Sequence, residues 1–246
     1  MIMSYCRYKN KIVVITGATS GIGESIARMY SIEGATVVLL GRNEDKGLKL
    51  QKDIKNSIFY KCNVVNVDEI ESIYNKIIFE FNGIDILVNN AGIMLDSKKI
   101  DELDYEDWKR TFDINVSGIF NVTKVFISSI VDRKGCIINN ASIAGMHSYV
   151  VGKTYAYSAS KAAVIQFTRQ IALNYAVDGI RVNCICPGIV DTPILGNRNR
   201  ETYAKKVPLG YIAKPEDIAK VVLFLTSDDA KYITGVVLPI DGGVSL

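Results

Sequence analysis

The 246-residue sequence predicts a single α/β domain in which helices cover both faces of a parallel, doubly wound sheet. Short runs rich in β-branched residues alternate about seven times with segments of helical periodicity. Several runs are continuously apolar, as expected for strands that are covered on both faces. In such a fold, ligands bind beyond the carboxyl ends of the strands, so the residues that follow each strand are the first candidates for chemistry.

The elements are expected in strict alternation along the chain. The predicted strands cover residues 12–15, 36–40, 57–60, 84–88, 136–138, 180–185 and 236–238. The predicted helices cover residues 24–33, 45–55, 67–81, 104–131, 155–177 and 215–226. The buried stripe of the 104–131 helix is expected to contain Trp108, Phe112, Val116, Ile119, Phe120, Thr123, Ile127 and Ile130.

The composition fits one domain over residues 1–246, since 48% hydrophobic and 22% charged residues supply an ample core. No repeat, low-complexity tract or linker divides the chain. The net charge is only +3, without basic blocks that interleave with aromatic residues, so nothing indicates a nucleic-acid partner. The apolar run at 12–15 is too short for a signal peptide or a membrane span, which predicts a cytoplasmic protein without membrane contact.

Five cysteines and one histidine make a metal site improbable. The cysteines form no Cys-x-x-Cys pair, and one histidine leaves no zinc ligand set, so no metal is expected. We expect the cysteines to be reduced and mostly buried thiols. Cys184 and Cys186 should share one face of a strand as small core residues.

A glycine-rich turn follows the first strand and precedes the first helix. Residues 16–23 read Thr-Gly-Ala-Thr-Ser-Gly-Ile-Gly. Glycines allow close approach of the backbone, so a pyrophosphate can rest against the free N–H groups and positive dipole of the helix start. Because of this position, a Rossmann-like dinucleotide site is favoured over a simple turn. The contacts are expected from Gly17, Ser20, Gly21, Ile22 and Gly23.

Tyr157 and Lys161 form a Tyr-x-x-x-Lys pattern at the start of an apolar helical stripe. One turn of helix separates them, so the phenol and the ammonium project from one face. A cation beside a phenol lowers a pKa that is about 10 in water and moves tyrosine toward acid/base work near neutrality. By itself the pattern also fits an exposed pair of side chains.

Taken together, Thr-Gly-x-x-x-Gly-x-Gly and Tyr-x-x-x-Lys resemble the short-chain dehydrogenase/reductase family, in its compact single-domain branch. The resemblance extends over essentially the whole chain. Its further motifs are Asn-Asn-Ala-Gly at 89–92, Asn115, Ser142, Pro187-Gly188 and Asp241-Gly242-Gly243.

This resemblance implies an NAD(P)(H)-dependent oxidoreductase that interconverts a secondary alcohol and a ketone. The matching catalytic residues are Tyr157 as general acid/base, Lys161 as the ribose ligand that lowers the tyrosine pKa, and Ser142 as donor to the reacting oxygen. Asn115 matches the residue that supports a water relay behind the lysine. Its alternative is an ordinary position on the solvent face of a helix.

The resemblance also assigns cofactor contacts. Thr192 matches the residue at the nicotinamide carboxamide, Ile189 lends its backbone beside it, and Asn89 supports the adenosine side near the glycine loop. Further contacts are implied for Asn63, Val64, Ala91, Gly92, Pro187 and Gly188.

Arg42 follows the second strand, where NAD-preferring domains carry an acidic residue for the ribose hydroxyl. An arginine there would pair with a 2′-phosphate, so NADP(H) is the expected cofactor and NAD(H) stays possible. The alternatives are an exposed arginine before the Asn43 helix cap, and a carboxylate of Glu44 or Asp45 that reaches the ribose.

Two features depart from the family pattern, and two others concern the substrate. Ser142 and Tyr157 are fifteen positions apart, whereas about thirteen is usual in the family, which implies that the 146–154 loop is about two residues longer. Tyr155 sits at the usual spacing from Ser142, but it has no lysine four residues later. Asn63 replaces the usual aspartate near the adenine amine. His147 falls in that loop and could line the substrate pocket. The family's substrate lid corresponds to 193–210 and carries four cations: Arg198, Arg200, Lys205 and Lys206. A solvated charge run is the favoured interpretation of these cations, and attraction of an anionic substrate is the alternative.

Two alternative functions remain open beside the small-molecule dehydrogenase. A 3-oxoacyl-[acyl-carrier-protein] reductase is one, with Arg133 and Lys134 as docking residues, although Asn174 stands where those reductases often carry arginine. A non-catalytic nucleotide-sensing protein is the other, and the intact Tyr157 and Lys161 pair argues against it. The resemblance implies a homotetramer or homodimer joined through helices 104–131 and 155–177, with Phe126 and Phe167 as exposed contacts.

Overall fold

The computed structural model describes residues 6–95, 98–147, 153–197 and 199–246 and contains a parallel seven-stranded sheet in the order β3-β2-β1-β4-β5-β6-β7. This is the predicted doubly wound fold. The strands are β1 (Ile12–Thr16), β2 (Thr36–Gly41), β3 (Ser57–Lys61), β4 (Ile86–Asn89), β5 (Cys136–Asn140), β6 (Arg181–Pro187) and β7 (Val237–Ile240). The helices are α1 (Gly21–Ile32), α2 (Glu44–Asp53), α3 (Val67–Phe81), α4 (Tyr105–Phe112), α5 (Gly118–Asp132), α6 (Tyr155–Tyr175), α7 (Arg200–Ala204) and α8 (Pro215–Thr226).

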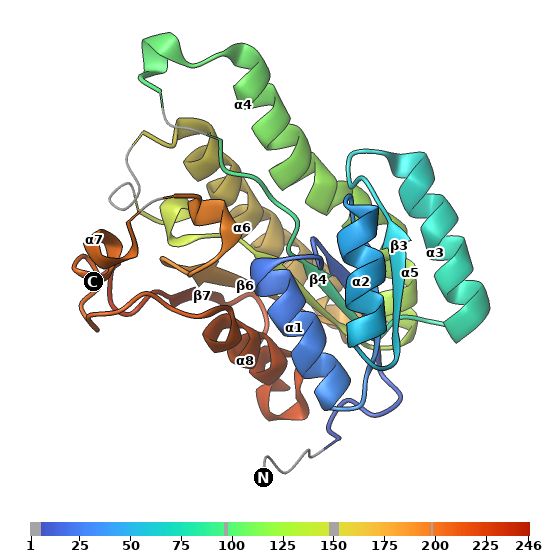
Figure 1. Ribbon diagram of the computed structural model, residues 1–246. Helices are drawn as coiled ribbons and strands as arrows, with labels where there is room; N and C mark the ends of the chain where they lie inside the picture. Colours follow the sequence, from blue (N-terminus) through green and yellow to red (C-terminus); the bar gives the residue numbers. More distant parts are fainter. Residues whose placement is uncertain (1–5, 96–97, 148–152, 198) are drawn as a thin grey trace.

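Helices cover both faces of the sheet (Figure 1). α1, α2 and α8 pack on one face, and α3, α5 and α6 pack on the other. Alternate residues of β1 serve the two cores, because Val13 and Ile15 point toward α1 while Val14 points toward α3 and α5. This two-sided burial accounts for the continuously apolar strands.

The long helix predicted over 104–131 is divided into α4 and α5 by a π-helical turn, Asp113–Ser117. A π turn holds one more residue than an α turn, so every later side chain rotates to a new direction. Within α5, Val122 and Phe126 face the core, whereas Phe120, expected in the buried stripe, is 47% exposed. The prediction of an exposed Phe126 was wrong, because Phe126 shares one helical face with the buried Ile119 and Ile130; Phe167 is only half-buried.

Within the described residues, the 105–132 segment is long and apolar enough to cross a membrane, but half of its most apolar 18-residue stretch is buried in the domain, as in a core helix. The strand order reverses between β1 and β4, where Ile15 pairs with Val88. The next residues of both strands therefore meet at one edge, where this fold binds ligands.

Candidate active site

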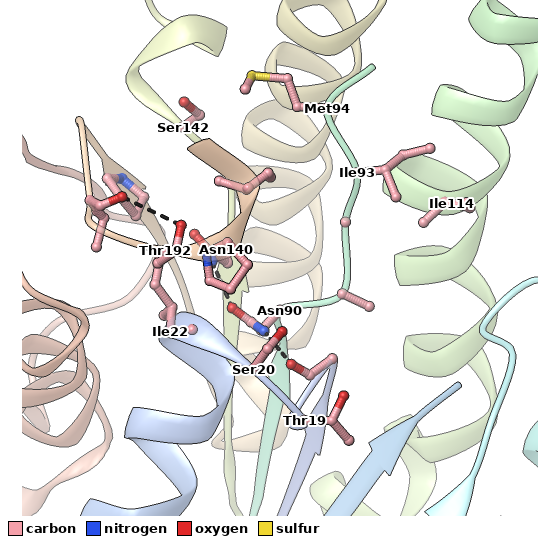
Figure 2. A pocket seen from close by; sticks show the side chains of 18 of the residues that line it. Thr19, Ser20, Ile22, Asn90, Ile93, Met94, Ile114, Asn140, Ser142 and Thr192 are labelled. Carbon is pink, nitrogen blue, oxygen red and sulfur yellow. Dashed lines mark hydrogen bonds between the residues drawn. The ribbon is translucent and has the colours of Figure 1, made fainter. Parts of the chain in front are cut away.

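The carboxyl ends of β1, β4, β5 and β6 border one cleft of about 650 Å³ (Figure 2). That volume is within the range of about 300–1,000 Å³ typical of small-molecule sites. Sixteen of the residues expected in the site line it: Gly17, Ser20, Gly21, Ile22, Arg42, Asn63, Val64, Ala91, Gly92, Ser142, Tyr157, Lys161, Pro187, Gly188, Ile189 and Thr192. Gly23, Asn89 and Asn115 lie outside its lining.

The glycine-rich turn packs tightly against the residues that follow β4. A Cβ atom on Gly17 would lie 2.9 Å from the Ala91 Cα, and one on Gly23 would lie 2.3 Å from the Gly17 carbonyl oxygen. Gly17 and Gly21 also have φ values of +64° and +57°, which favour glycine. The Ser20 side chain does not cap α1, so the first N–H groups of the helix are available to an anion. This cradle fits a dinucleotide pyrophosphate.

Asn90, rather than Asn89, supports the glycine-rich turn. The Asn90 side chain donates to the carbonyl oxygens of Thr16 and Gly17 at 3.2 and 3.1 Å. Asn89 points to the other face of the sheet, where it donates to Thr123 at 3.0 Å. The role expected for Asn89 beside the adenosine is therefore not consistent with its position. Successive strand residues point to opposite faces, a signal that could have identified Asn90.

Tyr157 and Lys161 lie one turn apart at the start of α6, as predicted, and both line the cleft. The Lys161 Nζ atom is 5.7 Å from the centre of the Tyr157 ring and donates to the Asn140 carbonyl oxygen at 2.7 Å. Ser142 follows β5 and is buried, and its Oγ atom accepts from the Ala144 N–H group at 3.2 Å. Tyr155 is 42% exposed and lies outside the lining, so the choice of Tyr157 agrees with the geometry.

Burial governs the protonation of the pair. Burial raises the pKa of Tyr157, and hydrogen bonding to Ser142 only partly opposes that rise. Burial also lowers the pKa of Lys161 to about 8. The direction for the protein by itself is therefore opposite to the expected lowering of the tyrosine pKa, because desolvation of the phenol exceeds the opposing effect of the Ser142 hydrogen bond.

Asn115 occupies the π-helical turn and is fully buried, which rules out the solvent-face alternative. Its Oδ1 atom accepts from the Ile93 N–H group at 2.8 Å, and its Nδ2 atom donates to the Ile93 carbonyl at 3.0 Å and to Ser160 at 3.0 Å. A Cβ on Gly92 would lie 3.2 Å from Asn115 Oδ1 and 3.4 Å from Lys161 Nζ. Asn115 thus fixes the wall of the cleft and borders the same space as the lysine.

Cations gather where β2 ends. Arg42 lines the cleft with Lys46, a residue that the sequence analysis missed although it lies one turn into α2. The Asn43 side chain caps α2 by accepting from the Lys46 N–H group at 2.9 Å. Glu44 pairs with Lys61 on β3 at 3.3 Å, so its carboxylate is engaged away from the arginine. This end of the cleft is therefore suited to an added phosphate.

The opposite end of the cleft is apolar. Figure 2 shows Met94 on the side of Ser142, away from Thr19 and Ser20. The other apolar or aromatic lining residues not predicted from the sequence include Ile93, Leu95, Ile114, Ile194, Leu195 and Tyr203.

Of the four lid cations, Arg200, Lys205 and Lys206 do not line the cleft, which agrees with a solvated charge run rather than with attraction of an anionic substrate. Arg200 pairs with Asp191 at 3.1 Å, and Lys206 lies over the Tyr203 ring at 5.4 Å. His147 is exposed and outside the lining. Arg198 and positions 148–152 of the lengthened loop are outside the described residues.

The cations expected to dock an acyl carrier protein lie at the opposite end of the strands from the cleft. Arg133 and Lys134 precede β5 and so mark the amino edge of the sheet, opposite the carboxyl edge that carries Ser142. The Arg133 guanidinium donates to the Asn82 carbonyl oxygen at 2.6 Å. Asn174 donates to the Gln170 carbonyl on its own helix at 2.6 Å.

Four of the five cysteines are buried and none forms a disulfide, in agreement with the expected reduced thiols; Cys6 is exposed.

A family model described as enoyl-(acyl carrier protein) reductase matches residues 17–245. The chain belongs to the short-chain dehydrogenase/reductase family. It is 38% identical to the 3-oxoacyl-[acyl-carrier-protein] reductase of Thermotoga maritima over 97% of this chain and 99% of that protein. It is 36% identical to 3beta-hydroxysteroid dehydrogenase 1 of Eggerthella lenta over 98% of this chain and 96% of that protein. The solved structure of the 3-ketoacyl-(acyl-carrier-protein) reductase of Brucella melitensis, complexed with NADH, superimposes with a TM-score of 0.92 at 29% sequence identity. The match covers 97% of this chain and 99% of that chain.

As a short-chain dehydrogenase/reductase, the chain is an NAD(P)(H)-dependent oxidoreductase that interconverts secondary alcohols and ketones. A bound nicotinamide supplies or accepts the hydride in this chemistry. The chain's own groups would bind and orient the reactants, shield them from water and move one proton.

Proposed function

We propose that this short-chain dehydrogenase/reductase prefers NADP(H) and acts on a neutral ketone with an apolar body and on the corresponding alcohol. The distribution of charge in one cleft carries the proposal. Arg42 and Lys46 lie at the end where β2 terminates, and Lys161 is the other charged side chain among the described lining residues. Because the proposal assigns Lys161 to the ribose of the cofactor, an anionic substrate would lack a charge partner of its own, and its desolvation would be costly.

The proposed proton transfer uses three side chains. Ser142 donates a hydrogen bond to the carbonyl oxygen, and Tyr157 gives its phenolic proton to that oxygen in reduction or takes the alcohol proton in oxidation. Lys161 holds the ribose and keeps a positive charge beside the phenol, and Asn115 keeps the adjoining wall in place. The raised pKa of Tyr157 keeps the phenol protonated at neutral pH, which suits the reductive direction.

A matched pair of ketones tests the substrate class. We expect loss of NADPH absorbance to be at least about tenfold faster, as kcat/KM, for a 4-alkylcyclohexanone than for 4-oxocyclohexanecarboxylate, because one buried unpaired charge costs more than 1.4 kcal/mol. Met94→Lys should lower the kcat/KM ratio of the neutral ketone to the carboxylate or reverse the preference. Met146→Lys, which lies outside the cleft lining, should leave that ratio unchanged. A wild-type preference for the carboxylate would contradict the proposed class.

A 3-oxoacyl-[acyl-carrier-protein] reductase is the second candidate, favoured by the similarity to the Thermotoga enzyme. The position of Arg133, on the other edge of the sheet, gives it no support. Rates with an acyl carrier protein substrate and with the N-acetylcysteamine thioester of the same acyl group separate the candidates. We expect similar rates; a large advantage for the carrier-bound form would favour the second candidate.

We also propose a cytoplasmic homodimer or homotetramer that associates through α5 and α6. Phe120 on α5 and Leu173 on α6 are 47% and 75% exposed, and the Phe120 ring lies 6.3 Å from the Phe167 ring. Apolar side chains exposed on neighbouring helices favour association. Sedimentation at micromolar concentration should reveal a dimer or tetramer that Leu173→Glu weakens. A monomer in the unmodified protein would contradict this assembly.

A further inference from the structure

Asn140, the last residue of β5, is connected to both halves of the cleft. Its backbone carbonyl oxygen accepts a hydrogen bond from Lys161 Nζ at 2.7 Å. Its side-chain Nδ2 atom donates to Asn90 Oδ1 at 2.8 Å. Figure 2 shows the two amides facing each other between Ile22 and the end of β4. The residue lines the cleft but is only 8% exposed.

Asn90 in turn is wedged into the glycine-rich turn. Besides its bonds to the Thr16 and Gly17 carbonyls, its backbone N–H group donates to Thr16 Oγ1 at 2.9 Å. A Cβ on Gly23 would lie only 2.6 Å from the Asn90 Nδ2 atom. Side chain and turn are therefore fitted to each other, and a rotation of the Asn90 amide would disturb the turn.

These contacts determine the orientation of both amides. Because Asn90 Nδ2 faces two carbonyl oxygens, Asn90 Oδ1 must face Asn140, and Asn140 must present its donor. Asn140 Oδ1 is then buried, and it has no hydrogen-bond partner among the described residues. The only side-chain hydrogen bond that the described structure gives Asn140 is the one to Asn90. Within the described structure, the Asn140 amide is therefore connected through Asn90 to the glycine-rich turn.

We propose that Asn140 is a positioning residue for the cofactor. Through Asn90, Asn140 holds the glycine-rich turn at a fixed position relative to Lys161. The inference rests on the binding of NADP(H) in this cleft. A residue that anchors the turn by its side chain and the lysine by its carbonyl aligns the pyrophosphate cradle with the group that would hold the ribose. Preorganisation of this kind reduces the ordering cost of binding.

Asn140→Leu tests the proposal, because it keeps the approximate side-chain volume and removes the donor. We expect the dissociation constant for NADPH, measured by fluorescence titration of the ligand-free enzyme, to rise about threefold to tenfold, the effect of one hydrogen bond. The KM for NADPH should rise similarly, while kcat and the KM for the ketone stay within about twofold. Affinity within twofold of the unmodified protein would overturn the inference.

Asn183→Leu is the matched control. Asn183 is also a buried strand asparagine, but its side chain bonds the Ile233 carbonyl and the Val236 N–H group, away from the cleft. This variant should lower the urea midpoint and leave the affinity for NADPH unchanged. Equal losses of affinity in both variants would indicate general destabilisation and overturn the assignment to Asn140.

A double-mutant cycle with Asn90→Leu identifies the route. If Asn140 acts through Asn90, the double variant should bind NADPH no more weakly than Asn90→Leu alone; additive losses would overturn that route. If the Asn140→Leu variant does not fold, the NADPH titration is repeated with Asn140→Ser, because a serine side chain is too short to reach Asn90. Failure of the unmodified protein to bind NADPH would instead refute the proposed cofactor, which separates the two failures.

Discussion

Consecutive asparagines at the ends of β4 and β5 make different contacts, because successive strand residues point to opposite faces of the sheet. Asn89 and Asn139 form a buried pair at 2.9 Å on the α5 side of the sheet, whereas Asn90 and Asn140 meet at 2.8 Å on the side of the glycine-rich turn. In the first pair, Asn89 Nδ2 donates to Asn139 and Thr123 inside the domain, while the Asn89 Oδ1 atom has no partner among the described residues. The second pair borders the cofactor cleft. A one-residue shift in either strand would exchange these roles.

Catalysis is expected to depend on the Tyr157 hydroxyl group. Tyr157→Phe should lose nearly all turnover, by a factor of about 100 or more, because only the transferable proton is removed. Fluorescence titration should show that NADPH still binds. Tyr155→Phe is the matched control and should keep most activity, since that side chain lies outside the cleft. Near wild-type kcat in Tyr157→Phe would refute the assignment.

Cofactor preference should depend on the two cations at the end of β2. Arg42→Ala should lower the kcat/KM ratio of NADPH to NADH about tenfold to a hundredfold, mainly through the KM for NADPH, because the contact is remote from the hydride. Lys46→Ala should lower it less, as a single exposed charge does. Lys49→Ala, in the same helix but outside the cleft, should leave it unchanged. An unmodified enzyme that prefers NADH would contradict the proposal.

At the scale of elements, the π-helical turn Asp113–Ser117 connects packing with function. It places Asn115 where both polar ends of its side chain bond Ile93. The neighbouring Ile114 packs in the core and also lines the cleft. One irregular turn thus serves the core and the cleft.

The amino end of β6 anchors the carboxyl end of α8. Arg181 donates to the carbonyl oxygens of Leu225, Ser227 and Ile233 at 2.6, 3.2 and 3.2 Å. Arg181→Ala should lower the free energy of unfolding in urea by about 2 kcal/mol, because charged hydrogen bonds to partly buried carbonyls are lost. Affinity for NADPH should not change, since the residue lies at the opposite edge from the cleft. A variant as stable as the unmodified protein would contradict this role.

At the scale of the molecule, a buried cluster ties the N-terminal segment to helices at opposite ends of the sequence. Tyr8 hydrogen-bonds to the Leu223 carbonyl and, at 2.9 Å, to Thr226, while Tyr30 reaches the same threonine at 2.7 Å. The two rings meet edge to face at 4.9 Å. Burial raises the pKa of Tyr8 to about 12 and that of Tyr30 well above its usual value.

Stability should therefore fall at alkaline pH. An unfolded tyrosine ionises near pH 10, whereas folded Tyr8 ionises at about 12, so its contribution is complete below about pH 10 and is lost as the pH rises toward 12. Urea midpoints measured between pH 8 and pH 12 should show this decline. Tyr8→Phe keeps the ring and removes the ionisable group, so its decline should be smaller. Parallel declines in the two proteins would exclude the Tyr8 contribution.

The sequence alone determined the features that rest on local spacing. Strand and helix periods predicted the sheet, the glycines between the first strand and first helix predicted the cradle, and one helical turn between Tyr157 and Lys161 predicted their common face. Each depends on residues close together in the chain, which is why no tertiary information was needed. The family resemblance supplied the roles, and its motifs recur in order from end to end.

Tertiary structure decided what depends on burial and on distant partners. It set the direction of the Tyr157 pKa, which desolvation raises, and it divided the predicted long helix by a π turn that buries Asn115. It also brought Asn90 rather than Asn89 against the glycine-rich turn and linked it to Asn140, fifty positions later. Residue spacing cannot encode such effects, because desolvation and long-range hydrogen bonds arise only when separate strands meet at the edge of the sheet.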